Sequence, residues 1–107
     1  MYDRLIEHLK NTGIPFAEAA WSKAPKTDYG VYAIDGAADT LWGDNRMIHQ
    51  AMEGTVDLFT HGTGMEQAKQ IQTALDAAGV SWQLSSVQFE EDTRLTHWEW
   101  IFQLEVW

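Results

Sequence analysis

The chain of 107 residues contains no cysteine, and this absence removes several classes of protein. Without cysteine there is no disulfide scaffold, no thiolate zinc site and no thiol nucleophile. Long apolar runs are absent too, since none approaches the roughly 18–20 residues that a membrane-spanning helix needs. The start of the chain, residues 1–7, has the charge pattern of an amphipathic helix and not of a signal peptide. We therefore expect an intracellular domain that is held together by its core alone.

Basic residues are scarce as well. Seven Lys and Arg stand against 16 Asp and Glu, which gives a formal net charge of −9. The basic residues are scattered, and only Lys23 and Lys26 lie close together. Because nucleic-acid binding proteins neutralise phosphates with clustered Lys and Arg, this balance opposes general nucleic-acid binding.

The residues that are present indicate one well-packed domain, residues 1–107. Apolar residues make up 45% of the chain and charged residues 21%, which is far from the composition of a disordered protein. A chain of this length can bury roughly 60–65% of the surface that its unfolded form exposes. The six tryptophans are more than the core of so small a domain usually contains.

Two segments have the periodicity of amphipathic helices. In the first, apolar residues recur three and four positions apart: Tyr2, Leu5, Ile6 and Leu9. Gly13 follows as a left-handed cap, and Pro15 prevents the helix from resuming. The second helix begins at a capping box formed by Thr63 and Glu66 and ends at Gly79. Its apolar face comprises Met65, Ala68, Ile71, Leu75 and Ala78.

Extended segments fill most of the remaining sequence. Strands are expected over residues 16–21, 29–34, 40–42, 47–60, 80–89 and 94–107. Gly54, inside the fourth of these segments, indicates a bulge or a close approach of two backbones. This order of elements predicts an α+β fold: a small, mainly antiparallel sheet with two helices packed on it.

The last two strands carry the strongest pattern. In the first of them apolar residues alternate with polar ones, and the alternation shifts at Ser85–Ser86, which predicts a bulge. Its inward side is expected to comprise Val80, Trp82, Leu84, Val87 and Phe89. The inward side of the final strand is expected to comprise Trp98, Trp100, Phe102, Leu104 and Val106. That strand is long enough that it either bends or leaves the domain to meet a partner.

No combination of residues points to catalysis or to a bound cofactor. Among the histidines, only His97 shares a strand face with a second potential ligand, Glu99, and a solvated polar face explains that pair equally well. Residues 62–64 open a helix, but they lack the Lys and the longer glycine pattern of phosphate-binding loops. The acidic clusters lie in turns, where carboxylates stay hydrated. We therefore expect no enzyme, no cofactor and no metal.

The tryptophans divide into two groups. Three fall on apolar strand faces and are expected in the core: Trp82, Trp98 and Trp100. The others lie beside a loop, in a turn-rich hairpin and at the end of the chain: Trp21, Trp42 and Trp107. Tryptophan is enriched at protein interfaces because it buries a large area with few rotatable bonds. The second group therefore comprises candidate assembly contacts, with the alternative that these residues cover the edges of the core.

The order of these sequence blocks supports a family resemblance. The blocks are residues 13–16 after the first helix, then 31–34, 42–45, 56–60, 66–80 and 98–105. In this order, which covers nearly the whole chain, the sequence resembles the small tail-completion, or tail-terminator, proteins of long-tailed bacteriophages and prophages. The resemblance implies a small sheet with packed helices and a structural subunit that is not an enzyme.

The resemblance implies a hexameric ring of copies that caps the finished tail tube, ends its polymerisation and docks to the head connector. The implied partners are further copies of the chain, a tail-tube protein and a connector or stopper protein, with no membrane and no sequence-specific nucleic acid. The implied location is the host cytoplasm during assembly and then the virion. A surplus of carboxylates suits a ring that DNA passes through, because they repel phosphate. The alternatives are a head-closure or other neck protein and a small acidic protein-binding module.

Overall fold

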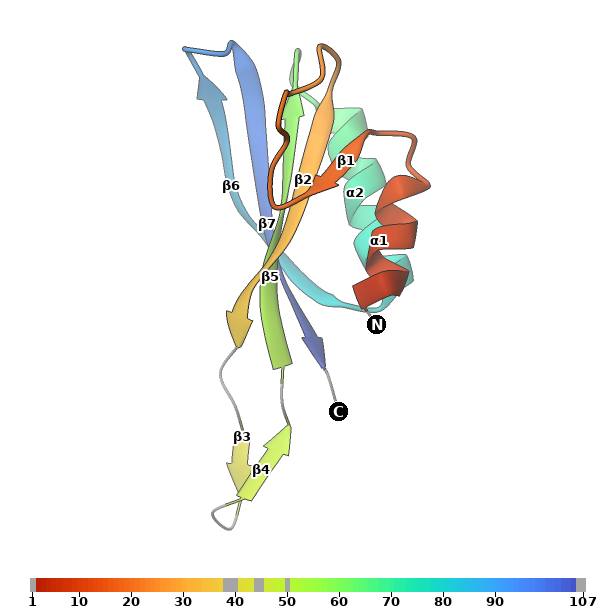
Figure 1. The fold of residues 1–107 in the computed structure, drawn as a ribbon, viewed down its shortest axis with the longest axis vertical. Coiled ribbons are helices and arrows are strands. Elements are labelled where there is room, and N and C mark those ends of the chain that lie inside the picture. Colours follow the sequence, from red (N-terminus) through yellow and green to blue (C-terminus); the bar gives the residue numbers. More distant parts are fainter. Residues whose placement is uncertain (1, 38–40, 44–45, 50, 106–107) are drawn as a thin grey trace.

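The chain forms a five-stranded sheet with two helices on one face, and a separate two-stranded hairpin (Figure 1). The computed structural model describes residues 2–37, 41–43, 46–49 and 51–105. The elements are α1 (Tyr2–Lys10), β1 (Phe16–Glu18), β2 (Tyr29–Ala37), β3 (Leu41–Gly43), β4 (Arg46–His49), β5 (Ala51–Thr60), α2 (Met65–Ala78), β6 (Ser81–Glu90) and β7 (Leu95–Glu105). The predicted α+β fold is confirmed.

The large sheet has the strand order β1-β2-β5-β7-β6, and the hairpin pairs β3 with β4. Strand β1 is parallel to β2, whereas all other neighbours in the sheet are antiparallel. The final strand stays in the sheet along its length, since β7 pairs with β5 from Thr96 to Glu105. A register shift in β6 between Leu84 and Ser86 confirms the predicted bulge.

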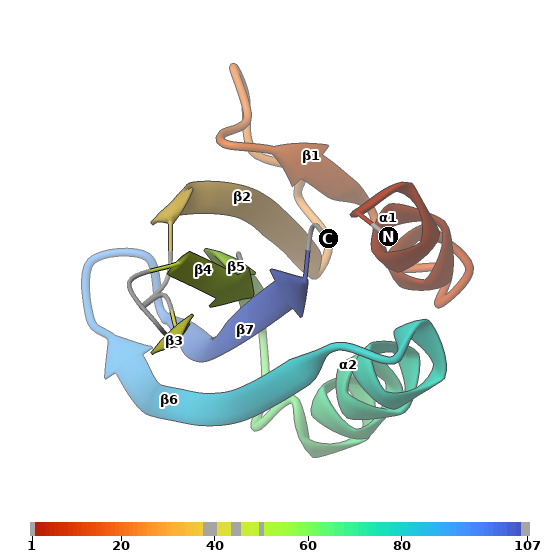
Figure 2. The ribbon, with the colours of Figure 1, turned by 90° about the horizontal axis from the view of Figure 1, so that it is seen from below.

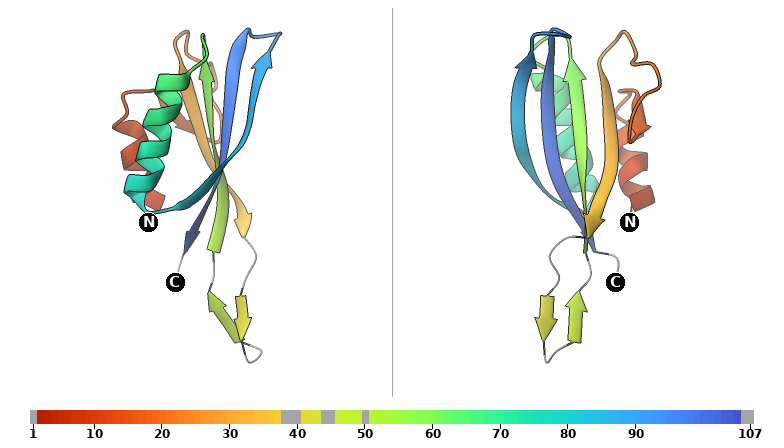
Figure 3. Two further views of the ribbon diagram at one scale, coloured as in Figure 1. Left: turned by 180° about the vertical axis from the view of Figure 1, so that it is seen from behind. Right: turned by 60° about the vertical axis from the view of Figure 1, so that its left-hand side comes forward.

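The core lies between the sheet and the two helices, which stand side by side on one face (Figures 2 and 3). Trp100 and Phe102 of β7 are fully buried, as are Leu5 and Leu9 of α1. Burying an aromatic side chain typically removes about 150–250 Å² of surface from water. Strand β7 therefore contributes much of the hydrophobic stabilisation. Neither α1 nor α2, the helices of the described residues, has the length and apolarity that crossing a bilayer requires.

The expected capping box at the start of α2 is wrong. The cap is Gly64, in the left-handed region at φ 75°, and no side chain caps the helix. The Thr63 hydroxyl accepts a long hydrogen bond, 3.5 Å, from the backbone N–H of Met65. Met65 is also 55% exposed and does not belong to the buried face. At the other end, Gly79 is a left-handed cap at φ 76°, as predicted.

Gly54 marks a close approach of backbones, as the sequence suggests. A Cβ atom at this position would lie 2.3 Å from the carbonyl oxygen of Ala33 and 2.5 Å from the ring of Phe102. Because real Cβ atoms do not approach other atoms so closely, glycine is required at this point of β5, which lies between β2 and β7 in the sheet.

Candidate functional site

The face of the sheet opposite the helices offers side chains to solvent, and we call it the open face. It comprises Tyr29, Val31 and Ala33 of β2 and the odd-numbered residues of β5 and of β7 from His97 onward. The even-numbered residues of the same strands point the other way, and Tyr32, Val56, Leu58, Trp98, Trp100, Phe102 and Leu104 among them are buried in the core. This split follows from the two-residue period of a strand, which sends successive side chains to opposite faces.

A row of aromatic rings crosses the open face near one end of the sheet. Tyr29, Phe59 and His97 stand directly opposite one another on β2, β5 and β7. Their rings stack, with centroids 4.9 Å apart for Tyr29 and Phe59 and 4.3 Å apart for Phe59 and His97. Trp21, from the segment after β1, meets the edge of the row against Tyr29. The folded sheet therefore brings together aromatic side chains that are far apart in the chain. Trp21 and His97, at the two ends of the row, are 76 positions apart.

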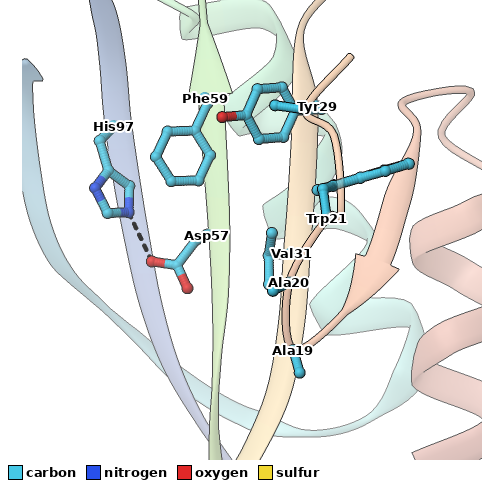
Figure 4. A pocket seen from close by; sticks show the side chains of 9 residues that line it. Ala19, Ala20, Trp21, Tyr29, Val31, Asp57, Phe59 and His97 are labelled. Atoms are coloured by element: carbon cyan, nitrogen blue, oxygen red, sulfur yellow. Dashed lines mark hydrogen bonds and ion pairs between the residues drawn. The ribbon is translucent and has the colours of Figure 1, made fainter. Parts of the chain in front are cut away.

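The row forms one wall of a shallow hollow of about 400 Å³. Figure 4 shows Phe59 and Tyr29 between His97 and Trp21, with Asp57 below the row. The remaining lining is small and apolar: Ala19, Ala20, Ala24 and Val31. Trp21 is held in place because its indole N–H donates to the carbonyl oxygen of Gly30 at 3.0 Å.

His97 lies between two carboxylates. Its Nε2 is 2.7 Å from Oδ1 of Asp57, and its Nδ1 is 3.3 Å from Oε2 of Glu90. A neutral imidazole donates through one nitrogen only, whereas an imidazolium donates through both. Both contacts can therefore be hydrogen bonds when His97, Asp57 and Glu90 together hold one proton more than a neutral imidazole beside two carboxylates.

Asp57 is a half-buried carboxyl of the open face. Burial raises the pKa of its carboxyl above the usual 3.8, and the carboxylate of Glu99 raises it further, while the contact with His97 lowers it. Asp57 and Glu99 stand directly opposite each other on β5 and β7. Like charges in this position are destabilising, so the pair is strained electrostatically unless a cation lies nearby.

The long strands carry charge of one sign. In the described residues of β2, β5, β6 and β7 there is no Lys or Arg. The same strands contain Asp35, Glu53, Asp57, Glu90, Glu99 and Glu105. Of these, Glu53, Asp57, Glu99 and Glu105 follow the alternation of the open face, which is therefore acidic.

The hollow has no evident means of catalysis. Its His97–Asp57 pair could orient a proton, but the lining includes no Ser, Thr or Cys to act as a nucleophile. Among the described residues, no group of three or more His, Cys, Asp or Glu side chains is arranged to hold a metal ion. The arrangement is suited to contacting another molecule through aromatic and acidic groups.

The structure describes the side chains of four of the six tryptophans, Trp21, Trp82, Trp98 and Trp100. Trp98 and Trp100 are buried and Trp82 packs against the core, as predicted. Their indole N–H groups donate to Thr63, Gln72 and Asp76, so all three bind α2 or the loop before it to the sheet. Trp21 is half-buried at the hollow. Trp42 belongs to β3, but its side chain lies outside the described part, and so does Trp107; their role as assembly contacts stays a prediction.

A second surface, on the edge strand β6, differs from the sequence prediction. Leu84, Val87 and Phe89 were expected to point inward but are 41%, 46% and 59% exposed. They do lie on the helix side of the sheet, because Leu84 and Val87 stand opposite Trp100 and Trp98. The alternation predicts the side correctly, but it cannot show that the helices end short of this edge. We call these three residues the apolar strip.

Comparison with known proteins identifies a likeness in fold. No model of a protein family matches the sequence, and no curated protein matches it either. A chain in a solved structure described as "Virion of native gene transfer agent (GTA) particle" is similar in structure, with a TM-score of 0.66. The match covers 98% of this chain and 92% of that chain at 12% sequence identity. At this identity the likeness shows a shared fold.

Proposed function

We propose that the protein is a structural component of a phage-like virion. At the head–tail junction, a ring of copies, a hexamer by analogy with tail terminators, caps the tail tube, ends its polymerisation and docks to the head connector. The observation that carries the proposal is the likeness in fold, along almost the whole of both chains, to a chain of a gene transfer agent virion. That likeness supports a virion role, whereas the place at the junction and the capping role rest on the order of sequence blocks, which resembles that of tail-terminator proteins.

The surfaces of the domain support a role in assembly. The hollow offers aromatic rings and carboxylates without a nucleophile, and the apolar strip offers an uncovered edge. A ring subunit needs two different surfaces that meet in the next copy and close by rotation. The partners in this proposal are further copies, the tail-tube protein and the connector, in the host cytoplasm during assembly and then in the virion.

The acidic open face suits a channel for DNA. If it lines the ring, its carboxylates repel the phosphates of DNA and prevent the duplex from adhering during passage. The structure of an assembled ring tests this arrangement directly. A lumen lined with Lys and Arg would contradict it.

Deletion of the gene from the phage or prophage that carries it tests the capping role. Without a terminator, the tail tube continues to polymerise, so electron micrographs should show tails longer than those of the wild type. A plasmid copy of the gene should restore the normal length, which serves as the control.

The same experiment separates the alternatives. Tails of normal length beside detached or leaking heads would identify a head-closure or neck protein instead. Normal particles would contradict a virion role and favour an acidic module that binds a basic partner. Trp21→Ala in the complementing copy tests the candidate assembly contact at the hollow, with restored tail length as the result that would exclude it.

A further inference from the structure

Of the features that keep sheet edges apart, the free edge of β6 has the bulge between Leu84 and Ser86 but neither charge nor proline along Ser81–Phe89. Among the described strands, β6 is the last of the sheet, and it is ten residues long. From Ser81 to Phe89 it contains no charged residue and no proline. Natural edge strands usually carry Lys or Pro, or are short, because an uncharged edge with free N–H and C=O groups pairs with other strands. The apolar strip lies on this same strand.

We propose that this edge is a subunit interface: β6 of one copy pairs with β1 of a second copy, and α1 of that second copy covers the apolar strip. The copies then add head to tail and extend one sheet. This interface deepens the proposed function by naming the surface through which copies associate, and it rests on the self-association proposed there.

Strand direction allows this pairing. Three successive antiparallel pairings, β2 with β5, β5 with β7 and β7 with β6, make β6 run opposite to β2. Strand β1 is parallel to β2, so β6 also runs opposite to β1. A second copy that continues the sheet therefore presents β1 in the antiparallel direction. Because β1 is three residues long, it pairs with part of the ten-residue β6.

The position of the helices favours β1 over a second β6 as the partner. Leu84, Val87 and Phe89 point out of the sheet on the helix side, so strand pairing alone leaves them exposed. Pairing of two β6 edges would place two uncovered strips side by side. Addition through β1 instead brings α1, which packs on that same side next to β1 (Figure 2). Of the two arrangements, the head-to-tail one brings a helix to the side on which the strip is exposed.

Charge favours a second copy of this chain over a partner of opposite charge. Two copies that each carry −9 repel one another wherever acidic surfaces meet. The stretch Ser81–Phe89 avoids this repulsion because it is uncharged. An interface built for a basic partner would instead be expected to present carboxylates, as the open face does.

Cysteine cross-linking tests the interface without background, because the natural chain has no cysteine. Ala17 alternates with Phe16, which packs in the core, and Gln88 stands opposite His97, so both point to the open face. Paired strands bring such residues within the distance that a disulfide spans. The double variants Ala17→Cys with Gln88→Cys, and Ala17→Cys with Ser86→Cys, cover two neighbouring registers.

On mild oxidation of the concentrated protein, the double variants should give a ladder of covalent oligomers that ends in a closed ring. The matched control pairs Gln88→Cys with Glu66→Cys, an exposed position on α2, and should give no ladder. Equal cross-linking of a single Ser86→Cys or Gln88→Cys variant would show pairing of two β6 edges and overturn the proposal. Double variants that cross-link no better than the control would overturn it too.

Lysine substitutions provide the second measurement. Val87→Lys with Phe89→Lys should weaken self-association by about tenfold or more, because a desolvated charge opposes pairing. Met65→Lys, which replaces an equally exposed apolar residue away from the edge, should change it less than about twofold. If the double lysine variant still restores normal tail length in the deletion strain, the interface is wrong while the capping role stands. The capping role itself is tested separately, by whether deletion of the gene alone gives overlong tails.

Discussion

At Asp57, burial and the neighbouring charges of the open face together set the pKa of a single carboxyl. It is half-buried, it faces Glu99 across the strands, and its Oδ1 lies 2.7 Å from Nε2 of His97. The folded chain binds the Asp57 proton more tightly than the unfolded chain does, since folding raises the pKa of this carboxyl. Its contribution therefore lowers the free energy of unfolding as pH rises from about 3.8 through the raised pKa.

Substitutions of the two neighbours should move the pKa of Asp57 in opposite directions. Glu99→Gln removes a negative charge and should lower that pKa, whereas His97→Gln removes a stabilising contact and should raise it. Titration of the Asp57 carboxyl carbon by NMR measures both shifts. Shifts of the same sign in the two variants would contradict the assignment of causes.

Gly54 is the second residue at which identity is dictated by its surroundings. Gly54→Ala should lower the free energy of unfolding by about 1–3 kcal/mol, because its Cβ would overlap the backbone of Ala33. Gly62→Ala is the matched control: no atom lies within 4 Å of its Cβ position, so the change should stay within about 0.5 kcal/mol. Urea denaturation measures both, and equal losses would argue against a steric origin.

Among the elements, α2 is the one for which the sequence predicts one end correctly and the other end wrongly. Gly79 closes it as expected, but Gly64 replaces the capping box at its start. The reason is tertiary: the turn before α2 lies against Thr60 and Trp98, and the indole of Trp98 donates to the carbonyl oxygen of Thr63. This packing fixes the backbone in a conformation that only glycine adopts easily.

Substitutions at the start of α2 should therefore reverse the usual ranking of helix caps. Thr63→Ala should cost less than about 0.5 kcal/mol, below the roughly 1 kcal/mol of a true capping residue. Gly64→Ala should cost at least about 1–2 kcal/mol, because φ is positive and the new Cβ would approach Thr60. Thermal or urea unfolding of the two variants decides the matter. A larger loss for Thr63→Ala would restore the capping box.

For the whole molecule, the net charge of −9 opposes association of copies while the apolar edge favours it. Salt screens the repulsion, since the Debye length falls from about 10 Å at 0.1 M to about 3 Å at 1 M. Raising sodium chloride from roughly 0.05 to 0.5 M should therefore strengthen self-association of the wild type, as measured by sedimentation equilibrium. Weaker association at high salt would indicate that ion pairs hold the copies together.

Local patterns were sufficient for most of the elements. Three- and four-residue spacing predicts both helices, and alternation predicts the buried side of β7, because these periods are properties of the backbone itself. The absence of cysteine and the negative charge likewise need no structure. The sequence predicts less about boundaries: the segment at residues 47–60 divides into β4 and β5, and β1 ends at Glu18.

Tertiary structure decided which of these residues meet and which stay exposed. Tyr29, Phe59 and His97 are far apart in the chain, and only strand register stacks them beside Trp21. Leu84, Val87 and Phe89 have the alternation of a buried strand face, yet the helices do not cover them. Periodicity specifies the direction of a side chain, whereas its burial depends on what another part of the chain, or another copy, places above it.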